Sequence, residues 1–416
     1  MSDETFFLIE PRDPLIARDG RPAAVGAFAS LPFPPPGILA GAARTRMASI
    51  DGAFTCPEED LAELLKIPVH GPLLGELAEG SEEVASWLAP SPRDAVLFGD
   101  ADLALLRRLA PRDLPDGARA GGFRGRGALE GRTVVGFADP EPEEKPLPKP
   151  PVFWRWERFA HWLGAAPDPP PGESESPGVL QDGEPVEPET LGLGPIEREP
   201  RAHLALEPGE RVGLEGLLFE TEGLRFLAKV PRGGKLAVRR LALGLRTPGG
   251  AIGNRALALS AELAPLGGER RLARWRPATG APWPALPPEI RARVIAERRA
   301  RIVLVTPAEF FAGSLPGWSG GGIPDLSGEA AEVTATVRAA CVPRAEVVSG
   351  WDLRLGQAKP SRRLAPAGSV YWVELGRDGD LGAWCDALWL RPVSDDEKAR
   401  RDGYGLAAIG VWEEGS

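Results

Sequence analysis

The chain has 416 residues, of which 43% are hydrophobic, and a formal net charge of −10 at pH 7. This length allows two domains with cores of their own. The net charge argues against non-specific nucleic-acid binding by the whole surface, because such binding depends on neutralising phosphates, but it leaves room for a local basic face. No apolar run approaches the roughly 18 residues of a membrane span. The first residues, MSDETFF, lack a secretion signal, so we expect a cytoplasmic protein.

The three cysteines, Cys56, Cys341 and Cys385, lie far apart and form no C-x-x-C pair. This spacing predicts neither a disulfide framework nor a zinc site, so we expect buried free thiols. No cluster of carboxylates has the spacing of metal ligands. We therefore expect no metal and no cofactor.

The N-terminal region predicts a strand, a loop and a helix in that order. Phe6 to Ile9 is a short apolar run typical of a strand. The Asp-Gly within residues 18–22 favours a tight turn, and the prolines of residues 32–36 hold the chain extended. Ile38 to Arg46 is rich in alanine and glycine and predicts a helix that lies close to a sheet.

Arginines stand at both ends of this region. Solvated surface charge is one interpretation; the other is a rigid platform that presents guanidinium groups to phosphates, which arginine binds through two parallel hydrogen bonds. The residues concerned are Arg12, Arg18, Arg21, Arg44 and Arg46.

The next hundred residues give mixed signals. Arg119 to Arg132 forms a glycine-rich loop with four arginines, which favours either RNA contact or a mobile surface loop. The spacing of two sets of leucines predicts helices with buried faces: Leu61, Leu64 and Leu65, then Leu103, Leu106 and Leu109.

From Asp139 to Pro200 the chain is rich in proline and acidic residues, which predicts a linker or insertion. Within it, Phe153 to Leu163 contains several aromatic residues and predicts a helix that docks on a neighbouring surface. Its aromatic side chains could stack on bases, but we favour burial. We place the domain junction in this segment.

A β region follows the linker. The runs Val212 to Leu218 and Leu224 to Val230 flank Glu222-Gly223, which predicts a hairpin. The segment from Arg225 to Arg255 contains eight basic residues and no acidic one. In an acidic protein, this is the clearest local sign of a basic face.

The last third of the chain contains a second glycine-rich loop. Arg291 to Arg301 predicts a solvated helix, and Ile302 to Val305 predicts a short buried strand. The loop that follows has neither phosphate-loop nor dinucleotide-binding spacing, yet its backbone could approach nucleotides closely. Its tryptophan could stack on a base, although we favour the core. The residues singled out are Gly317, Trp318, Gly320, Gly321 and Gly322.

Two groups of motifs carry a resemblance to a known family. The first group is EPRDPLIARDGRP followed by LPFPPPGILAGAARTR; the second includes AKPSRR, PAGSVYW and DGYGLA near the C-terminus, with a looser match in HLALEPGERVGLEGLLFETEGLRF. In this order they resemble the RAMP-superfamily subunit of type III-B CRISPR effector (Cmr) complexes that pairs with the large polymerase-like protein.

The resemblance implies an α+β fold of two ferredoxin-like (RRM-like, RAMP) domains with glycine-rich loops and insertions. We expect the N-terminal domain at residues 1–138, the linker or insertion at 139–200 and the C-terminal domain at 201–416. The family role implied is to bind the repeat-derived 5′ tag of the guide RNA (crRNA). The implied partners are the large polymerase-like subunit, a backbone subunit and, indirectly, target RNA.

On this interpretation the arginines of the first motif hold the tag and are joined by three cations of the second domain, Lys359, Arg362 and Arg363. We expect no catalytic residue, because the three histidines, His70, His161 and His203, lie apart from one another and from glycine-rich loops. Two alternatives stay open: a metal-independent guide-precursor endoribonuclease that uses His203, and a purely structural assembly subunit.

Overall fold

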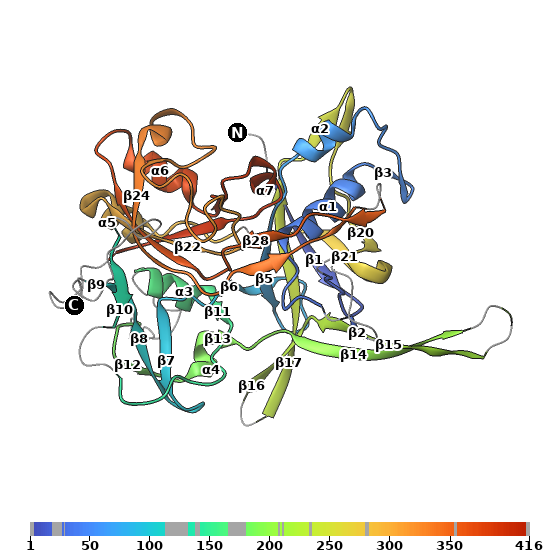
Figure 1. The fold of residues 1–416 in the computed structure, drawn as a ribbon, viewed down its shortest axis with the longest axis horizontal. Helices are drawn as coiled ribbons and strands as arrows, with labels where there is room; N and C mark the ends of the chain where they lie inside the picture. The colour runs from blue at the N-terminus through green and yellow to red at the C-terminus, as the bar shows by residue number, and fades with distance from the viewer. Residues whose placement is uncertain are drawn as a thin grey trace.

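Two large antiparallel sheets with few helices form the fold, which is of the α+β type (Figure 1). This computed structural model describes residues 4–18, 27–28, 30–112, 132–137, 142–164, 180–206, 209, 212–232, 235–278, 283–352 and 356–412. Across these ranges, no helix is long and apolar enough to span a membrane.

The first sheet surrounds the predicted N-terminal strand, which is confirmed as β1 (Thr5–Pro11). Phe7 and Ile9 enter one hydrophobic core and Leu8 enters the other, as the two-residue period of a strand requires. The strand order is β13 (Gly192–Leu193), β11 (Phe153–Arg155), β6 (Val84–Pro90), β5 (His70–Leu77), β17 (Lys235–Thr247), β1, β21 (Leu272–Pro277) and β20 (Glu262–Pro265), with β16 (Leu227–Arg232) paired to β17.

Helix α1 (Pro36–Met47) covers one face of this sheet and confirms the predicted helix. Pro36 occupies its first turn, where the missing N–H has no helical partner to lose. Ala40 and Ala43 are fully buried in the same core as the odd-numbered residues of β1. Small side chains therefore bring the helix close to the sheet, as expected.

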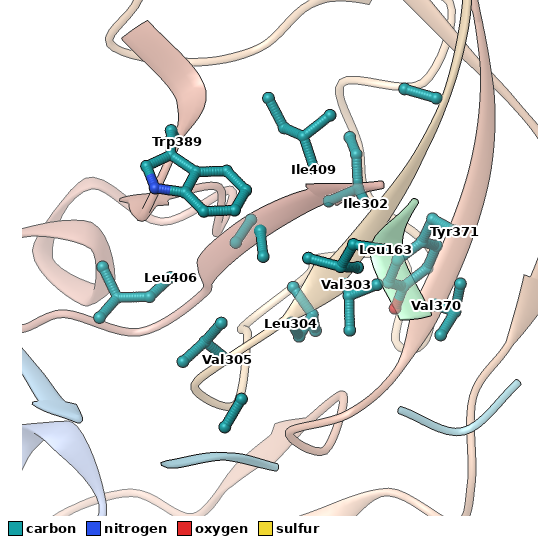
Figure 2. Close-up of a cluster of buried hydrophobic side chains, with 14 of the residues drawn as sticks. Leu163, Ile302, Val303, Leu304, Val305, Val370, Tyr371, Trp389, Leu406 and Ile409 are labelled. Atoms are coloured by element: carbon teal, nitrogen blue, oxygen red, sulfur yellow. The ribbon is translucent and has the colours of Figure 1, made fainter. Parts of the chain in front are cut away.

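The second sheet has the order β23 (Gly321–Gly322), β24 (Thr334–Cys341), β29 (Val370–Leu375), β22 (Arg299–Leu304), β31 (Leu406–Gly410) and β30 (Arg391–Pro392). Its central strand β22 confirms the strand predicted at residues 302–305, and Figure 2 shows Ile302 to Val305 packed among aliphatic and aromatic side chains. Helices α5 (Pro288–Glu297) and α6 (Leu381–Leu388) both pack against β31.

The predicted helix at residues 291–301 ends earlier than expected. Helix α5 stops at Glu297, Arg298 adopts a left-handed conformation, and β22 begins at Arg299. Arg301 is therefore buried in the sheet instead of solvated. Its guanidinium donates to the carboxylate of Asp94 and to the carbonyl oxygen of Val411, 2.6 Å away.

A long insertion, residues 78–234, separates β5 from β17. Helix α2 (Leu61–Lys66) just before β5 confirms one predicted leucine helix, but the other prediction is wrong. Residues 104–108 form β8 (Ala104–Arg108), which lies between β7 (Ala95–Gly99) and β12 (Glu184–Val186). A short apolar run fits the period of a helix as well as that of a strand. Here its pairing with strands from other parts of the chain makes it a strand. A further pair joins β9 (Ala110–Arg112) to β10 (Val134–Gly136).

The hairpin predicted around Glu222-Gly223 is also wrong. Residues 213–225 form one strand, β15 (Gly213–Arg225), which pairs with β14 (Glu197–Leu206) in an arm that projects from the molecule (Figure 1). A Cβ on Gly223 would lie 2.6 Å from Cβ of Pro14. This glycine permits close approach of another segment within a strand, so it does not mark a turn.

The predicted domain junction does not separate the two sheets. Strands β17 and β21 both pair with β1, so residues 235–277 belong to the first sheet although we expected them in a domain of residues 201–416. The chain passes to the second sheet between β21 and β22. Within the expected linker, β11 and α3 (Trp156–Leu163) are ordered, and α3 is buried as favoured.

Candidate nucleic-acid interface

The two signature groups of the sequence meet at a seam between the sheets. The seam consists of α1 and the turn 401–405, which follows α7 (Glu397–Arg401). Arg44 is only 4% exposed. Its guanidinium donates to the carboxylate of Asp402, to the carbonyl oxygen of Ile67 at 2.9 Å and to that of Arg401 at 3.0 Å. Arg44 therefore fastens the first sheet to the second.

Tyr404 extends the seam toward the start of α1. A Cβ on Gly37 would lie 3.1 Å from the Tyr404 hydroxyl oxygen, so the helix begins directly against the ring. The guanidinium of Arg362 lies 4.4 Å from the centroid of the same ring and 3.0 Å from the carboxylate of Glu309. Burial raises the pKa of the Tyr404 hydroxyl above its ordinary value.

The five arginines predicted to form one platform go to different places. Arg44 lies inside the seam, and the Nε of Arg46 lies 2.7 Å from the carboxylate of Glu262 on β20. Arg18 forms an exposed ion pair with Glu269 at 3.2 Å, and Arg12 is exposed just after β1. Arg21 lies outside the described residues. The sequence shows the cations, whereas their acidic partners come from segments more than two hundred residues away.

Four basic residues of the acid-free segment from Arg225 to Arg255 pair with acids that lie elsewhere in the sequence: Lys229, Arg239, Arg240 and Arg246. Lys229 pairs with Glu197 at 2.8 Å and Arg239 with Glu79 at 3.1 Å. Arg240 pairs with Glu10 at 2.8 Å. The guanidinium of Arg246 is buried over the ring of Trp283, and burial lowers its pKa to about 10. These four cations of the basic stretch are therefore not available as a free basic face in the fold.

The second glycine-rich loop is held in a fixed shape by Asp395. Its carboxylate accepts hydrogen bonds from the backbone N–H of Phe311 at 2.8 Å and of Gly317 at 2.9 Å. Trp318 is buried, as we favoured, and its indole N–H donates to the carbonyl oxygen of Val393 at 2.9 Å. Gly320 donates to Ala335 at 2.8 Å, and the next two glycines, Gly321 and Gly322, form β23 at the edge of the second sheet.

The predicted cations of the second domain lie beside this loop. Ala308, at its start, pairs with Ala365, directly after β28 (Arg362–Leu364). β28 pairs in turn with β25 (Glu346–Val348), and the enclosed hairpin of β26 (Trp351–Asp352) and β27 (Gln357–Ala358) leads to Lys359. Lys359 and Arg363 are exposed, whereas Arg362 is half-buried against Tyr404. The exposed pair and the loop form what we call the loop surface, residues 309–322 with Lys359 and Arg363.

Sequence reasoning missed one residue of the loop surface. Phe311 is 77% exposed, whereas its neighbour Phe310 is buried. Two adjacent phenylalanines give no sign of which ring points inward. The distinction comes from Tyr371 on β29, whose ring packs edge-on against that of Phe310.

The three histidines lie far from this surface or deep inside the protein. Burial, and next the charge of Arg246, lower the pKa of His70 to about 3. His161 is buried in α3. On the arm, His203 lies 2.8 Å from the Thr221 hydroxyl and stacks on Phe219. Among the residues with described positions, no group of three or more His, Cys, Asp and Glu could hold a metal ion.

Comparison with known proteins identifies the class. The family model described as "CRISPR-associated protein (Cas_Cmr3)" matches residues 7–412. The chain belongs to this family of CRISPR-associated proteins, and the family resemblance seen in its motifs is confirmed. No curated protein sequence gives a significant match.

Two solved chains match this chain in a structural comparison. They come from cryo-EM structures of the type III-B Cmr-beta bound to cognate target RNA, one of them also with AMPPnP. Each is 12% identical to this chain, and the match covers 88% of this chain and 86% of the other. The TM-scores are 0.44 and 0.40.

Proposed function

We propose that this protein is a non-catalytic subunit of a type III-B CRISPR (Cmr) complex and binds the repeat-derived 5′ tag of the guide RNA. The family match and the motif resemblance support this role. We further propose that it bridges the large polymerase-like subunit and a backbone subunit, and contacts target RNA only indirectly. Bridging rests on the family match.

The strand orders support two ferredoxin-like units. In the first sheet, the chain order β1, β5, β17, β21 gives the spatial order β21, β1, β17, β5. In the second sheet, the chain order β22, β24, β29, β31 gives β31, β22, β29, β24. Both read four-one-three-two with antiparallel neighbours, which is the strand order of a β-α-β-β-α-β unit. In the described chain, a 3-10 turn takes the place of one α-helix in each unit, at Gly268–Arg270 in the first and at Gly328–Glu332 in the second. The first unit carries the long insertion between its second and third strands.

The loop surface is the observation that carries the RNA-binding proposal. Lys359 and Arg363 are exposed beside a loop whose backbone is fixed by Asp395. Fixed backbone and exposed cations suit a phosphate chain, because little conformational freedom is lost when RNA binds. Arg12 and Arg18 follow the C-terminal end of β1 and are not part of the loop surface. We therefore place the principal RNA contact on the second domain and not on the first.

The absence of catalysis in this proposal is supported by the histidine environments. A general base needs a pKa near the working pH. The pKa of His70, at about 3, leaves it neutral and unable to exchange a proton usefully near pH 7. His203 lies on the arm, where its imidazole contacts the Thr221 hydroxyl and the Phe219 ring, neither of which could share a proton with it near pH 7.

A charge-reversal experiment tests the proposal. We expect Lys359→Glu with Arg363→Glu to weaken binding of single-stranded RNA carrying the repeat-derived 5′ segment about 10-fold or more and to reduce its salt dependence. The matched control is Lys66→Glu with Arg293→Glu, which changes net charge equally on α2 and α5. Equal losses in both double variants, or no loss in either, would contradict a local site. A second experiment incubates the purified protein with repeat RNA in EDTA, and we expect the RNA to be recovered intact. A defined cut that is abolished by His203→Ala would instead favour the endoribonuclease.

A further inference from the structure

The loop surface presents one aromatic ring to solvent. Among the large hydrophobic side chains with described positions, Phe311 is the most exposed. Leaving a phenylalanine in water forgoes the favourable burial of its apolar area. Phe310 next to it is buried, with its ring centroid 5.8 Å from that of Tyr371. The exposed ring therefore contributes little to the folding of this chain and is available to a partner.

The backbone that carries Phe311 is fixed on both sides. Its own N–H donates to Asp395, and the N–H of Glu309 donates to the Ser394 hydroxyl at 3.0 Å. Gly313 has a φ of 82°, and its N–H closes a turn onto the carbonyl oxygen of Phe310 at 3.0 Å. Because the left-handed conformation at Gly313 suits glycine, this turn is built into the sequence. The backbone position of Phe311 is thus set within this chain.

The surroundings of the ring favour a base over a protein partner. The residues that follow, Ala312, Gly313 and Ser314, are small and exposed, while Leu315 is buried. A protein interface needs a packed cluster of side chains around its anchor, whereas one ring is enough to stack an unpaired base. The neighbouring cations of the loop surface can hold the phosphates on either side of such a base.

We propose that Phe311 is the stacking platform for one unpaired base of the guide RNA's repeat-derived 5′ segment. This inference rests on the proposed function and assigns it a specific residue. The ring face contacts the base face, and the adjoining cations of the hairpin contact the backbone. Since every base has a π-face, the platform selects an unpaired nucleotide at a fixed position and tolerates its identity.

The test combines variants of the full-length protein with RNAs in which each nucleotide of the 5′ segment is replaced in turn by an abasic one. Binding is measured by fluorescence anisotropy. We expect Phe311→Ala to weaken binding of the intact RNA about 10-fold, and Phe311→Trp to preserve it. Abasic substitution at one position should weaken binding by the wild type but cause no further loss in Phe311→Ala. Phe54→Ala, at a ring that is 50% exposed on β4 (Ala53–Phe54), is the matched control and should change nothing.

The outcomes separate this inference from the proposed function. If Phe311→Ala binds every RNA as the wild type does while Lys359→Glu with Arg363→Glu loses affinity, the platform is wrong and the function stands. If none of these variants loses affinity, both are wrong. A loss that is uniform over all abasic positions also overturns stacking, and so does normal RNA binding combined with lost association with other Cmr subunits. Thermal unfolding of Phe311→Ala at the wild-type temperature, expected for an exposed side chain, confirms an intact fold.

Discussion

The seam and the loop surface use their cations in opposite ways, although both are built from the signature motifs. At the seam, the Arg44 guanidinium is buried and donates to Asp402 and to two carbonyl oxygens. At the loop surface, Lys359 and Arg363 are exposed, and within the described ranges no ion pair is recorded for either side chain. The same residue types therefore perform different tasks at these two places.

This difference teaches how to interpret arginine-rich motifs. Removing a guanidinium from water costs several kcal/mol unless a carboxylate or carbonyl oxygens replace the lost hydration. A buried arginine therefore marks a fixed joint of the fold, while an exposed cation keeps its charge available to a ligand. The distinction depends on where the carboxylates lie in space, which composition does not show.

The largest expected effect is a loss of stability when the carboxylate at the seam is removed. Asp402→Ala leaves the Arg44 guanidinium buried without its acidic partner, and breaking a buried pair in this way costs about 3–5 kcal/mol. We expect a loss of this size in the free energy of unfolding, measured by urea denaturation. The thermal midpoint should fall as well.

The matched control for the seam is an ion pair on the surface. Asp386→Ala removes the partner of Arg291, which lies 3.0 Å away with both side chains substantially exposed. Solvated pairs of this kind contribute little. Equal losses for Asp402→Ala and Asp386→Ala would mean that the seam is not the joint that we infer.

A smaller loss of stability is expected when the pH is lowered, because of the buried His70 near the seam. Because burial and nearby arginines lower the pKa of His70 to about 3 in the folded chain, the unfolded chain binds one more proton between about pH 6.5 and 3. The free energy of unfolding therefore falls as the pH is lowered through this window, by about 2 kcal/mol at pH 5 relative to pH 8. His70→Asn should show a shallower decrease in denaturation curves across this range. An identical pH dependence would rule out this assignment.

Local features of the fold were predictable from the sequence. Strand β1, helix α1, helix α2 and strand β22 all follow from apolar runs, small-residue patterns and prolines that act over a few residues. The burial of α3 follows from its aromatic composition. Each of these depends on neighbours close in sequence, so a single chain carries the information.

Long-range pairing was not predictable in the same way. Strand β17 pairs with β1 although the two are more than two hundred residues apart in sequence. Because β21 also pairs with β1, the chain enters the second sheet only after β21 and not at the expected linker. The roles of Arg44 and Phe311 were missed for the same reason. Asp402 and Tyr371, which decide them, are remote in sequence, and no local pattern names a partner at that distance.

The smallest expected change in stability is at the loop surface. Lys359→Ala with Arg363→Ala should change the free energy of unfolding by no more than about 0.5 kcal/mol, because exposed side chains outside buried networks contribute little. The same double variant should weaken binding of the repeat-derived RNA segment, since it removes cations from the proposed phosphate contacts. Urea denaturation and anisotropy on the same preparation compare the two quantities directly. A large loss of stability would show that these cations support the fold, as Arg44 does at the seam, and do not form a ligand surface. An exposed side chain that binds a partner contributes to binding without stabilising the fold.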